Sequence, residues 1–144
     1  MTDVNRPEPH VFELFDRAMR VLRADLDELM PDFGRKLRTS HLRLLSYIPE
    51  TGIRVGDLAT EAGMTAQAVG EFARDLRAVG LVELAPDPTD RRARLVTLTG
   101  EGREVVTATT AAIAAMEARR RADLGEKTWA ALRSALSQLG AARG

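Results

Sequence analysis

The first thirty positions of the chain carry apolar residues at helical spacing. Gaps of mostly three or four residues separate Val11, Phe12, Phe15, Met19, Leu22, Leu26 and Leu29. This spacing places them on one face of a helix that Pro31 ends. A shorter pattern follows, starting at Ser40, whose side chain can cap a helix, and stopping at Pro49. The first stripe is long for so small a chain, so we expect part of it to face a partner subunit.

Two further helices are predicted in close succession. One fits residues 55–62, and Gly63 suits the left-handed position that follows a helix. Thr65 can cap the next helix, whose inward face is predicted to hold Val69, Phe72, Leu76 and Val79. Two helices joined by a tight turn that contains glycine are typical of a helix-turn-helix.

The periodicity then changes from helical to strand-like. Residues 81–84 and 95–98 form two short apolar runs, and the turn-rich polar stretch 86–92 lies between them. Two such runs around a turn predict a β-hairpin. A hairpin directly after a helix-turn-helix is a wing.

The remainder of the chain is predicted to be helical. Thr99 can cap one helix, Gly125 interrupts the pattern, and a last helix carries Trp129, Leu132, Leu136 and Leu139. The expected fold is therefore mainly α with a small β-hairpin. We expect an N-terminal dimerisation helix (1–34), a winged helix-turn-helix lobe (35–100) and C-terminal dimerisation helices (101–144). The alternative for the terminal helices is a larger core within one monomer.

Composition removes most enzyme and metal chemistry. The chain has no cysteine, and its two histidines are His10 and His41. Disulfides, thiolate zinc sites and thiol redox switches therefore need residues that the chain lacks. The HExxH, P-loop, GxSxG and GxGxxG patterns are also missing. We expect no catalytic site, no metal and no cofactor.

Charge and hydropathy narrow the expected location and partners. The 21 basic and 21 acidic residues cancel, and residues 1–34 are net acidic while the rest is slightly basic. This is not the strongly basic surface of a nonspecific nucleic-acid binder. No run of about 18 apolar residues predicts a membrane span, and the first ten residues lack the apolar stretch of a secretory signal. We expect a cytoplasmic protein.

One stretch is more specific than the pattern of helices. It reads Asp-Pro-Thr-Asp-Arg-Arg-Ala over residues 87–93, followed by Val-Thr-Leu-Thr over 96–99 and by Gly102. Upstream lie Asp-Leu-Ala at 57–59 and Gly-Leu-Val at 80–82. In these motifs the chain resembles the MarR family (multiple antibiotic resistance regulators). The resemblance implies a homodimeric regulator, acting as a repressor, that binds a pseudo-palindromic operator in double-stranded DNA.

The fourth predicted helix supplies candidate base contacts. The N-terminal part of a recognition helix meets base edges in the major groove. Gln67 can pair with adenine through two hydrogen bonds, and the methyl group of Ala68 can pack on that of thymine. Thr65 and Arg74 project from the same helix. The alternative for Gln67 is a solvated helix residue. Glu71 could accept a hydrogen bond from cytosine, and its alternative is a pair with a neighbouring arginine on the same helix.

The wing supplies candidate backbone and minor-groove contacts. Arg91, Arg92 and Arg94 lie at or near the hairpin turn, and guanidinium groups are attracted by a narrow minor groove. By resemblance, Asp90 shapes the wing by pairing with Arg92 while an arginine at the tip reaches DNA. The alternative is a surface salt bridge worth ~0–1 kcal/mol. Arg94 fits a phosphate contact or a solvated position equally.

Three more residues are candidates for phosphate contacts. Arg54 precedes the third predicted helix, and Thr39 and Ser40 lie where the second begins. Free N–H groups at a helix N-terminus favour an anion, although capping explains Ser40 equally well.

The resemblance also implies a pocket for a small phenolic or anionic ligand near the junction of the dimer helices and the DNA-binding lobe. The candidate pocket residues are Phe15, Arg17, Arg20, His41 and Tyr47. His41 also fits a polar surface position. The alternative function for the whole chain is a winged-helix module that binds protein instead of DNA, and an enzyme is a third class without a candidate site.

Overall fold

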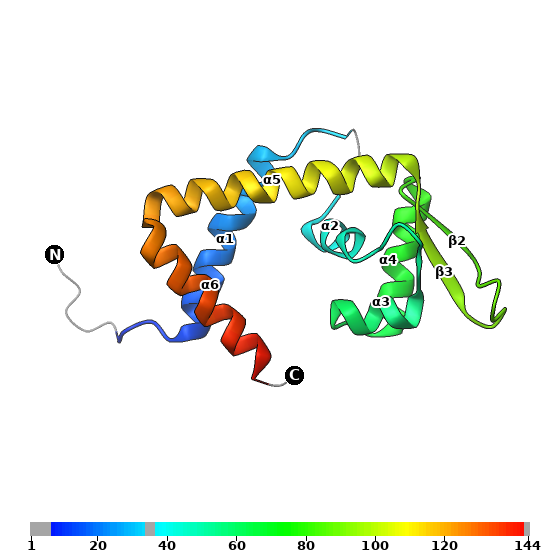
Figure 1. Ribbon diagram of the computed structural model, residues 1–144, viewed down its shortest axis with the longest axis horizontal. Coiled ribbons are helices and arrows are strands. Elements are labelled where there is room, and N and C mark those ends of the chain that lie inside the picture. Colours follow the sequence, from blue (N-terminus) through cyan, green and yellow to red (C-terminus); the bar gives the residue numbers. More distant parts are fainter. Residues whose placement is uncertain (1–6, 34–36, 143–144) are drawn as a thin grey trace. The chain divides into compact units, whose positions relative to one another are not determined.

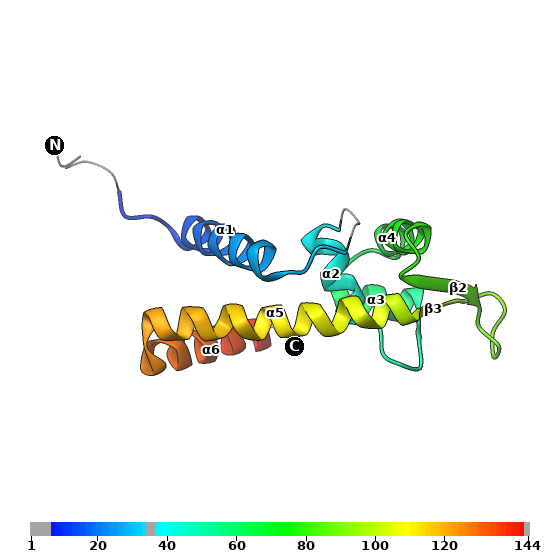
Figure 2. The ribbon, with the colours of Figure 1, turned by 90° about the horizontal axis from the view of Figure 1, so that it is seen from above.

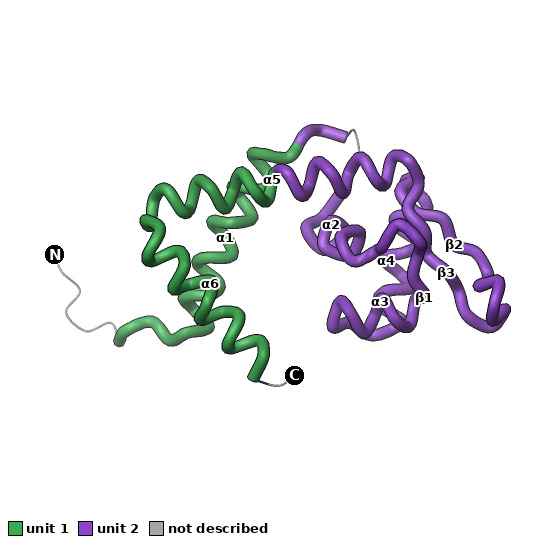
Figure 3. The backbone as a smooth tube through the Cα atoms, in the orientation of Figure 1, with its two compact units in different colours: residues 1–30, 112–144 green, residues 31–111 purple. Residues whose placement is uncertain are grey.

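The computed structural model describes residues 7–33 and 37–142, and these form six helices and three short strands. They divide into two units (Figure 3), residues 31–111 and residues 1–30 with 112–144. We call these the wing unit and the terminal unit. The boundary predicted between residues 34 and 35 lies outside the described residues, and the three-part division of the chain stays a prediction.

The terminal unit contains α1 (Val11–Leu29), the second half of α5 (Gly100–Leu124) and α6 (Glu126–Ala141). The side chain of His10 caps α1 by accepting a hydrogen bond from the backbone N–H of Glu13. Gly125 separates α5 from α6 with a φ of 86°, a conformation that glycine adopts without a steric penalty. The predicted break at this glycine is confirmed.

The helices of the wing unit are α2 (Thr39–Ser46), α3 (Val55–Ala62) and α4 (Ala66–Ala78). Gly63 ends α3 in the left-handed region, with φ 63°, and Thr65 caps α4 by accepting from the N–H of Ala68 at 3.1 Å. Both local signals were readable in the sequence, and the predicted helix-turn-helix is confirmed (Figure 1).

The wing is a three-stranded antiparallel sheet rather than the predicted two-stranded hairpin. Its strands are β1 (Ile53–Arg54), β2 (Val82–Pro86) and β3 (Arg94–Leu98), in the order β1-β3-β2. Leu84 pairs with Val96 across the hairpin, and Ile53 pairs with the same residue from the other side. The strand β1 was missed because two residues are too short to show periodicity. The hairpin of β2 and β3 extends past α3 and α4 in both views (Figure 1 and Figure 2).

The core of the wing unit is apolar and fully enclosed. Among the described residues, all of the largest fully buried side chains belong to this unit, namely Leu44, Leu45, Leu58, Val69, Leu76, Leu81, Val82, Val96 and Val105. The predicted inward face of α4 is partly right. Val69 and Leu76 are fully buried, but Phe72 and Val79 are half-buried, and Ala73 is buried in their place.

The predicted cap of the second helix is wrong. The helix α2 begins at Thr39, so Ser40 lies inside its first turn and is exposed. Arg38 occupies the N-cap position, and its backbone N–H donates to Nδ1 of His41 at 3.1 Å. The side chain of His41 therefore takes part in the cap from inside the helix. Serine is a preferred capping residue and histidine is not, so the sequence favoured Ser40.

The start of α5 is fixed by a close approach at Gly102. A Cβ atom at this position would lie 2.0 Å from the carbonyl oxygen of Leu81. Thr99 holds the same turn, because its hydroxyl oxygen accepts from the N–H of Gly102 at 3.0 Å and donates to the carbonyl of Gly80 at 2.7 Å. The glycine is therefore required by space and not by backbone conformation.

Candidate nucleic-acid interface

The exposed side of α4 carries the candidate base contacts. Gln67 and Arg74 are exposed, whereas Ala68 is half-buried. The hydroxyl of Thr65 is engaged in capping α4. Gln67 lies in the first turn of α4, and its side chain forms no hydrogen bond or ion pair with another described residue. Because the cap and the buried opposite face hold α4 in place, the side chain of Gln67 projects from a fixed backbone position.

Asp87 holds the base of the wing loop through hydrogen bonds of its side chain and of its backbone. Its Oδ1 accepts from the backbone N–H and from the hydroxyl of Thr89, both at 2.8 Å. Its Oδ2 accepts from Nε of Arg54 at 2.5 Å, and the same guanidinium donates to the hydroxyl of Thr89 at 3.1 Å. The backbone N–H of Asp87 also donates to the carbonyl of Ala93 at 2.9 Å.

These bonds shift the titration of the two charged groups. The hydrogen bonds from Thr89, together with the guanidinium of Arg54, lower the pKa of Asp87 to about 2. The hydrogen bond to Asp87 raises the pKa of Arg54. Asp87 is buried, with 6% of its surface exposed, so the loop is built around an ionised carboxylate.

Asp90 and the wing arginines lie at the tip of the same loop. The backbone N–H of Arg92 donates to Oδ1 of Asp90 at 3.1 Å, and Nε of Arg92 lies 3.7 Å from the same oxygen. The side chain of Arg92 is 96% exposed, and Arg91 is also exposed. A pair this open to solvent holds the guanidinium only weakly, so both cations are available to a partner at the tip.

Three candidate arginines lie against other parts of the wing unit. Arg54 was predicted to touch phosphate, and the structure places its guanidinium on Asp87 and Thr89 with 41% of the side chain exposed. Arg94 and Arg74 line a small cavity of about 220 Å³ between α4 and the sheet, together with Gly70 and Leu84. Thr39 is half-buried and Ser40 is exposed, both within the first turn of α2.

The predicted ligand residues are distributed over the two units. Phe15, Arg17 and Arg20 lie on α1, and Arg17 pairs with Glu13 on the same helix. Tyr47 ends α2 and lies 5.8 Å beneath the guanidinium of Arg43. His41 is buried and lines a cavity inside the wing unit with other residues than these four.

Sequence reasoning missed two residues that organise this surface. Asp87 was read only as part of a motif, and the role of Arg54 as its partner depends on a contact between positions 33 apart. The Asp-x-Thr spacing at 87–89 was the available signal, because an aspartate side chain readily bonds to the backbone two residues on.

The described residues offer no metal centre and no membrane-spanning helix. In residues 7–33 and 37–142, no cluster of three or more histidine or carboxylate side chains is placed to hold a metal ion. Nor does any described helix combine the length and apolarity that crossing a membrane requires.

Similarity to known sequences is concentrated in about half of the chain. A family model described as the MarR family matches residues 36–93. An uncharacterised protein of Mycobacterium tuberculosis is 38% identical over 68 residues, which are 47% of this chain and 48% of that protein. The chain therefore spans about half the length of the curated relatives it matches.

Solved structures extend the likeness to the terminal helices. The PcaV transcriptional regulator from Streptomyces coelicolor, in complex with its natural ligand, has a TM-score of 0.80 at 21% identity and is matched over 100% of both chains. The S. aureus MepR–DNA complex has a TM-score of 0.78 at 21% identity over 92% of this chain and 97% of that one. At this level of identity the likeness establishes a shared fold.

Proposed function

Because a model of the MarR family matches residues 36–93, we propose that the chain is a DNA-binding transcriptional regulator that acts as a repressor. In this proposal it binds a pseudo-palindromic operator as a homodimer and is released by a small molecule. It is not an enzyme and needs no cofactor. A regulator of this kind works where the DNA is, so we place it in the cytoplasm and off the membrane.

The wing carries the proposal. Asp87, Arg54 and Thr89 fix the loop from inside, and the cations of Arg91 and Arg92 are left exposed at its tip. A turn that is held from inside and carries two exposed guanidinium groups suits the negative potential of a minor groove. In the S. aureus MepR–DNA complex a protein of this fold is bound to DNA.

The helix α4 supplies the sequence-dependent part of the proposal. Gln67 is exposed in the first turn, which in helix-turn-helix proteins is the part that meets base edges. Thr65, Ala68, Arg74 and Arg94 are further candidate contacts, and Thr39 and Ser40 are candidates for a phosphate at the start of α2. We assign Arg54 and Asp90 to shaping the wing.

The terminal unit supports the homodimer. Val11, Phe12, Leu136 and Leu139 are exposed on α1 and α6, although they are large and apolar. A two-fold dimer buries such faces and places two copies of α4 on one duplex. The small molecule that releases the DNA is proposed to be phenolic or anionic, and PcaV, which shares this fold, was solved in complex with its natural ligand.

The proposal is tested by selecting genome fragments with the purified chain and sequencing those that are retained. A shared inverted repeat among the fragments is the expected result. On that operator, Gln67→Ala should cost about 1–3 kcal/mol, with little change on random duplex, because a base-edge contact is lost. Retention of no common sequence at low salt would reject DNA recognition and leave the protein-binding module.

A further inference from the structure

A cavity of about 220 Å³ lies in the wing unit between α4 and the sheet. The residues that line it are Val55 at the start of α3, Gly70, Ala73 and Arg74 on α4, Leu84 on β2 and Arg94 on β3. Its volume is below the range of about 300–1,000 Å³ that is usual for pockets of whole small molecules. The cavity therefore suits a single chemical group, and its two arginines indicate which group that is.

Both arginines of this cavity lack a partner. Arg74 and Arg94 are exposed, and neither side chain forms a hydrogen bond or an ion pair with another described residue. None of the described carboxylates lines the cavity. Arg54 on the neighbouring strand differs, because its guanidinium is paired with Asp87. Two like charges at the border of one cavity repel each other, so an anion between them is favoured.

Gly70 keeps the cavity open. It lies inside α4, and it is not among the glycines of the described chain that have a positive φ. An added Cβ atom would meet no other part of the described chain within 4 Å. Glycine inside a helix destabilises it relative to alanine, and here neither backbone conformation nor packing requires it. The space beside Gly70 is therefore available to a group from outside the chain.

The grooves of DNA supply such a group at this place. When the first turn of α4 lies in a major groove and the tip of the hairpin in the adjacent minor groove, one sugar–phosphate strand has to pass between them. The cavity lies between the same two elements, because Arg74 belongs to α4 and Arg94 to the hairpin. A phosphodiester also offers two free oxygens to the two guanidinium groups, and such charge-assisted hydrogen bonds are strong.

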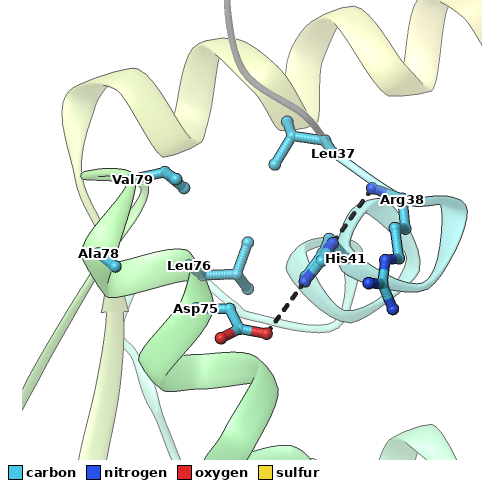
Figure 4. Close-up of a pocket in the computed structure, with 7 residues that line it drawn as sticks. All are labelled: Leu37, Arg38, His41, Asp75, Leu76, Ala78 and Val79. Carbon is cyan, nitrogen blue, oxygen red and sulfur yellow. Dashed lines mark hydrogen bonds and ion pairs between the residues drawn. The ribbon is translucent and has the colours of Figure 1, made fainter.

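The flank of α4 that faces α2 carries an acid instead. Figure 4 shows Asp75 beside His41 there, with Oδ2 of Asp75 3.6 Å from Nε2 of His41. The side chain of Asp75 is 68% exposed, so its carboxylate repels a phosphate on that flank. This polarity of α4 favours a phosphate on the flank toward the sheet, where Arg74 lies.

We propose that the cavity between α4 and the sheet binds one backbone phosphate of duplex DNA, held jointly by Arg74 and Arg94 beside Gly70. This phosphate site rests on the proposed function in one respect, which is that α4 and the wing bind DNA. Its role is positional, because a phosphate contact fixes the register of a protein on the duplex without reading a base. The phosphate site then sets how far Gln67 reaches into the major groove.

The salt dependence of binding distinguishes one shared phosphate from two separate ones. Each neutralised phosphate contributes about 0.9 to the log–log slope of affinity against salt on duplex DNA. Arg74→Gln and Arg94→Gln alone should each leave the slope nearly unchanged, because the other arginine still neutralises the phosphate. The double variant should flatten the slope by about 0.9 and bind random duplex roughly 10–100-fold more weakly. Arg121→Gln is the control, since it removes the same charge outside the wing unit.

Gly70→Leu tests the space without removing a cation. The leucine side chain occupies the cavity, so duplex affinity should fall and the slope should flatten by about 0.9, as in the double variant. Leucine is a better helix former than glycine, and an added Cβ atom meets no other part of the described chain within 4 Å. The unfolding midpoint, followed by circular dichroism, should therefore not fall. A purely structural role of Gly70 would not weaken binding while stability is retained.

A single uncharged linkage in the operator locates the phosphate. A methylphosphonate placed at each linkage in turn should weaken the unmodified chain most at one position in each half-site. This position should lie between the bases that α4 contacts and the minor groove that the wing contacts. The variant with both Arg74→Gln and Arg94→Gln should be insensitive to the substitution there, because it no longer contacts that phosphate.

Three results would overturn the phosphate site. They are a slope flattened by about 0.9 in each single variant, an unchanged slope in the double variant, or a Gly70→Leu variant that binds duplex as tightly as the unmodified chain. Each of these results leaves DNA binding standing. The slopes are measured on random duplex, so they test the site even where no operator is recovered. Absence of any duplex binding at low salt would overturn the proposed function and the phosphate site together.

Discussion

The wing unit and the terminal unit use their apolar residues in opposite ways. Residues 31–111 enclose their large aliphatic side chains almost completely, whereas most of those in the terminal unit remain exposed. Of the twelve large apolar side chains that are exposed among the described residues, only Tyr47 belongs to the wing unit. Exposed apolar patches of this extent mark interaction surfaces.

A cluster of charged side chains connects the helices of the terminal unit, which buries few large apolar side chains. Asp25 is buried and accepts from Nε of Arg120 at 2.5 Å, from a second nitrogen of the same guanidinium at 2.6 Å and from Arg119 at 3.1 Å. This cluster ties α1 to α5. The wing unit is thus stabilised by its own core, whereas we expect the terminal unit to become complete only with a second copy.

The largest predicted effect comes from placing charge on the exposed apolar face of α6. Leu132→Asp with Leu136→Asp should convert the dimer to monomer, because each large apolar side chain buried at an interface contributes about 1.5–3 kcal/mol. Operator affinity should fall by on the order of 1,000-fold, since one copy of α4 then binds alone. Sedimentation and titration on the operator measure the two effects.

The matched control for this pair is Ser134→Asp, which adds charge to the same helix on a different face. It should leave the dimer intact. A double variant that still sediments as a dimer would show that the terminal helices are not the interface.

The second largest predicted effect is a loss of DNA affinity when the two exposed arginines of the wing are removed. Arg91→Ala with Arg92→Ala should weaken operator and random duplex alike, by roughly 10–100-fold at moderate salt, because phosphate contacts are lost. The log–log salt dependence of the affinity should flatten by about one to two units. The variant should remain dimeric by sedimentation, as should the control Arg121→Ala. Unchanged salt dependence would remove the wing from the interface.

The third prediction tests the charge cluster of the terminal unit. Asp25→Asn should lower the unfolding midpoint, because the half-buried guanidinium groups of Arg119 and Arg120 lose the buried carboxylate that they share. Glu28→Gln is the control, since that side chain is 70% exposed and an exposed pair contributes about 0–1 kcal/mol. Equal midpoints for the two variants would show that the cluster is not a structural tie.

The smallest predicted effect is a loss of stability in acid that depends on Asp87. The pKa of Asp87 is lowered from 3.8 to about 2 in the folded chain, so its carboxylate stabilises the fold fully above its ordinary pKa, and this contribution is lost as the pH falls toward 2. The stability difference between the unmodified chain and Asp87→Asn should therefore shrink between about pH 4 and pH 2. Unfolding by urea at several pH values measures it, and a constant difference would contradict the assignment.

The parts of this fold that the sequence predicts are those determined by neighbours along the chain. Gly63 and Thr65 mark the turn of the helix-turn-helix because a left-handed glycine and a capping hydroxyl act within three residues. Gly125 separates α5 from α6 for the same local reason. The short apolar run at residues 95–98 similarly predicts β3.

Contacts between distant positions were beyond that reasoning. Arg54 and Asp87 are 33 residues apart, and Asp25 and Arg120 are 95 apart, so nothing in their surroundings predicted either pair. The cap of α2 was missed for a different reason, because His41 competes there with the more typical Ser40. The candidate DNA contacts stay predictions, since exposure of Gln67 or Arg91 permits a contact without requiring one.

Gly102 has a consequence for the spectrum of loss-of-function alleles. The Cβ atom of any other residue there would lie 2.0 Å from the carbonyl oxygen of Leu81. Missense changes at this codon should therefore recur among spontaneous null alleles. Gly56 and Gly140 have no atom within 4 Å of an added Cβ, and alanine alleles of these codons should be silent. A genetic screen for derepression would then map the start of α5 as a hot spot, although no ligand or DNA contact is proposed there.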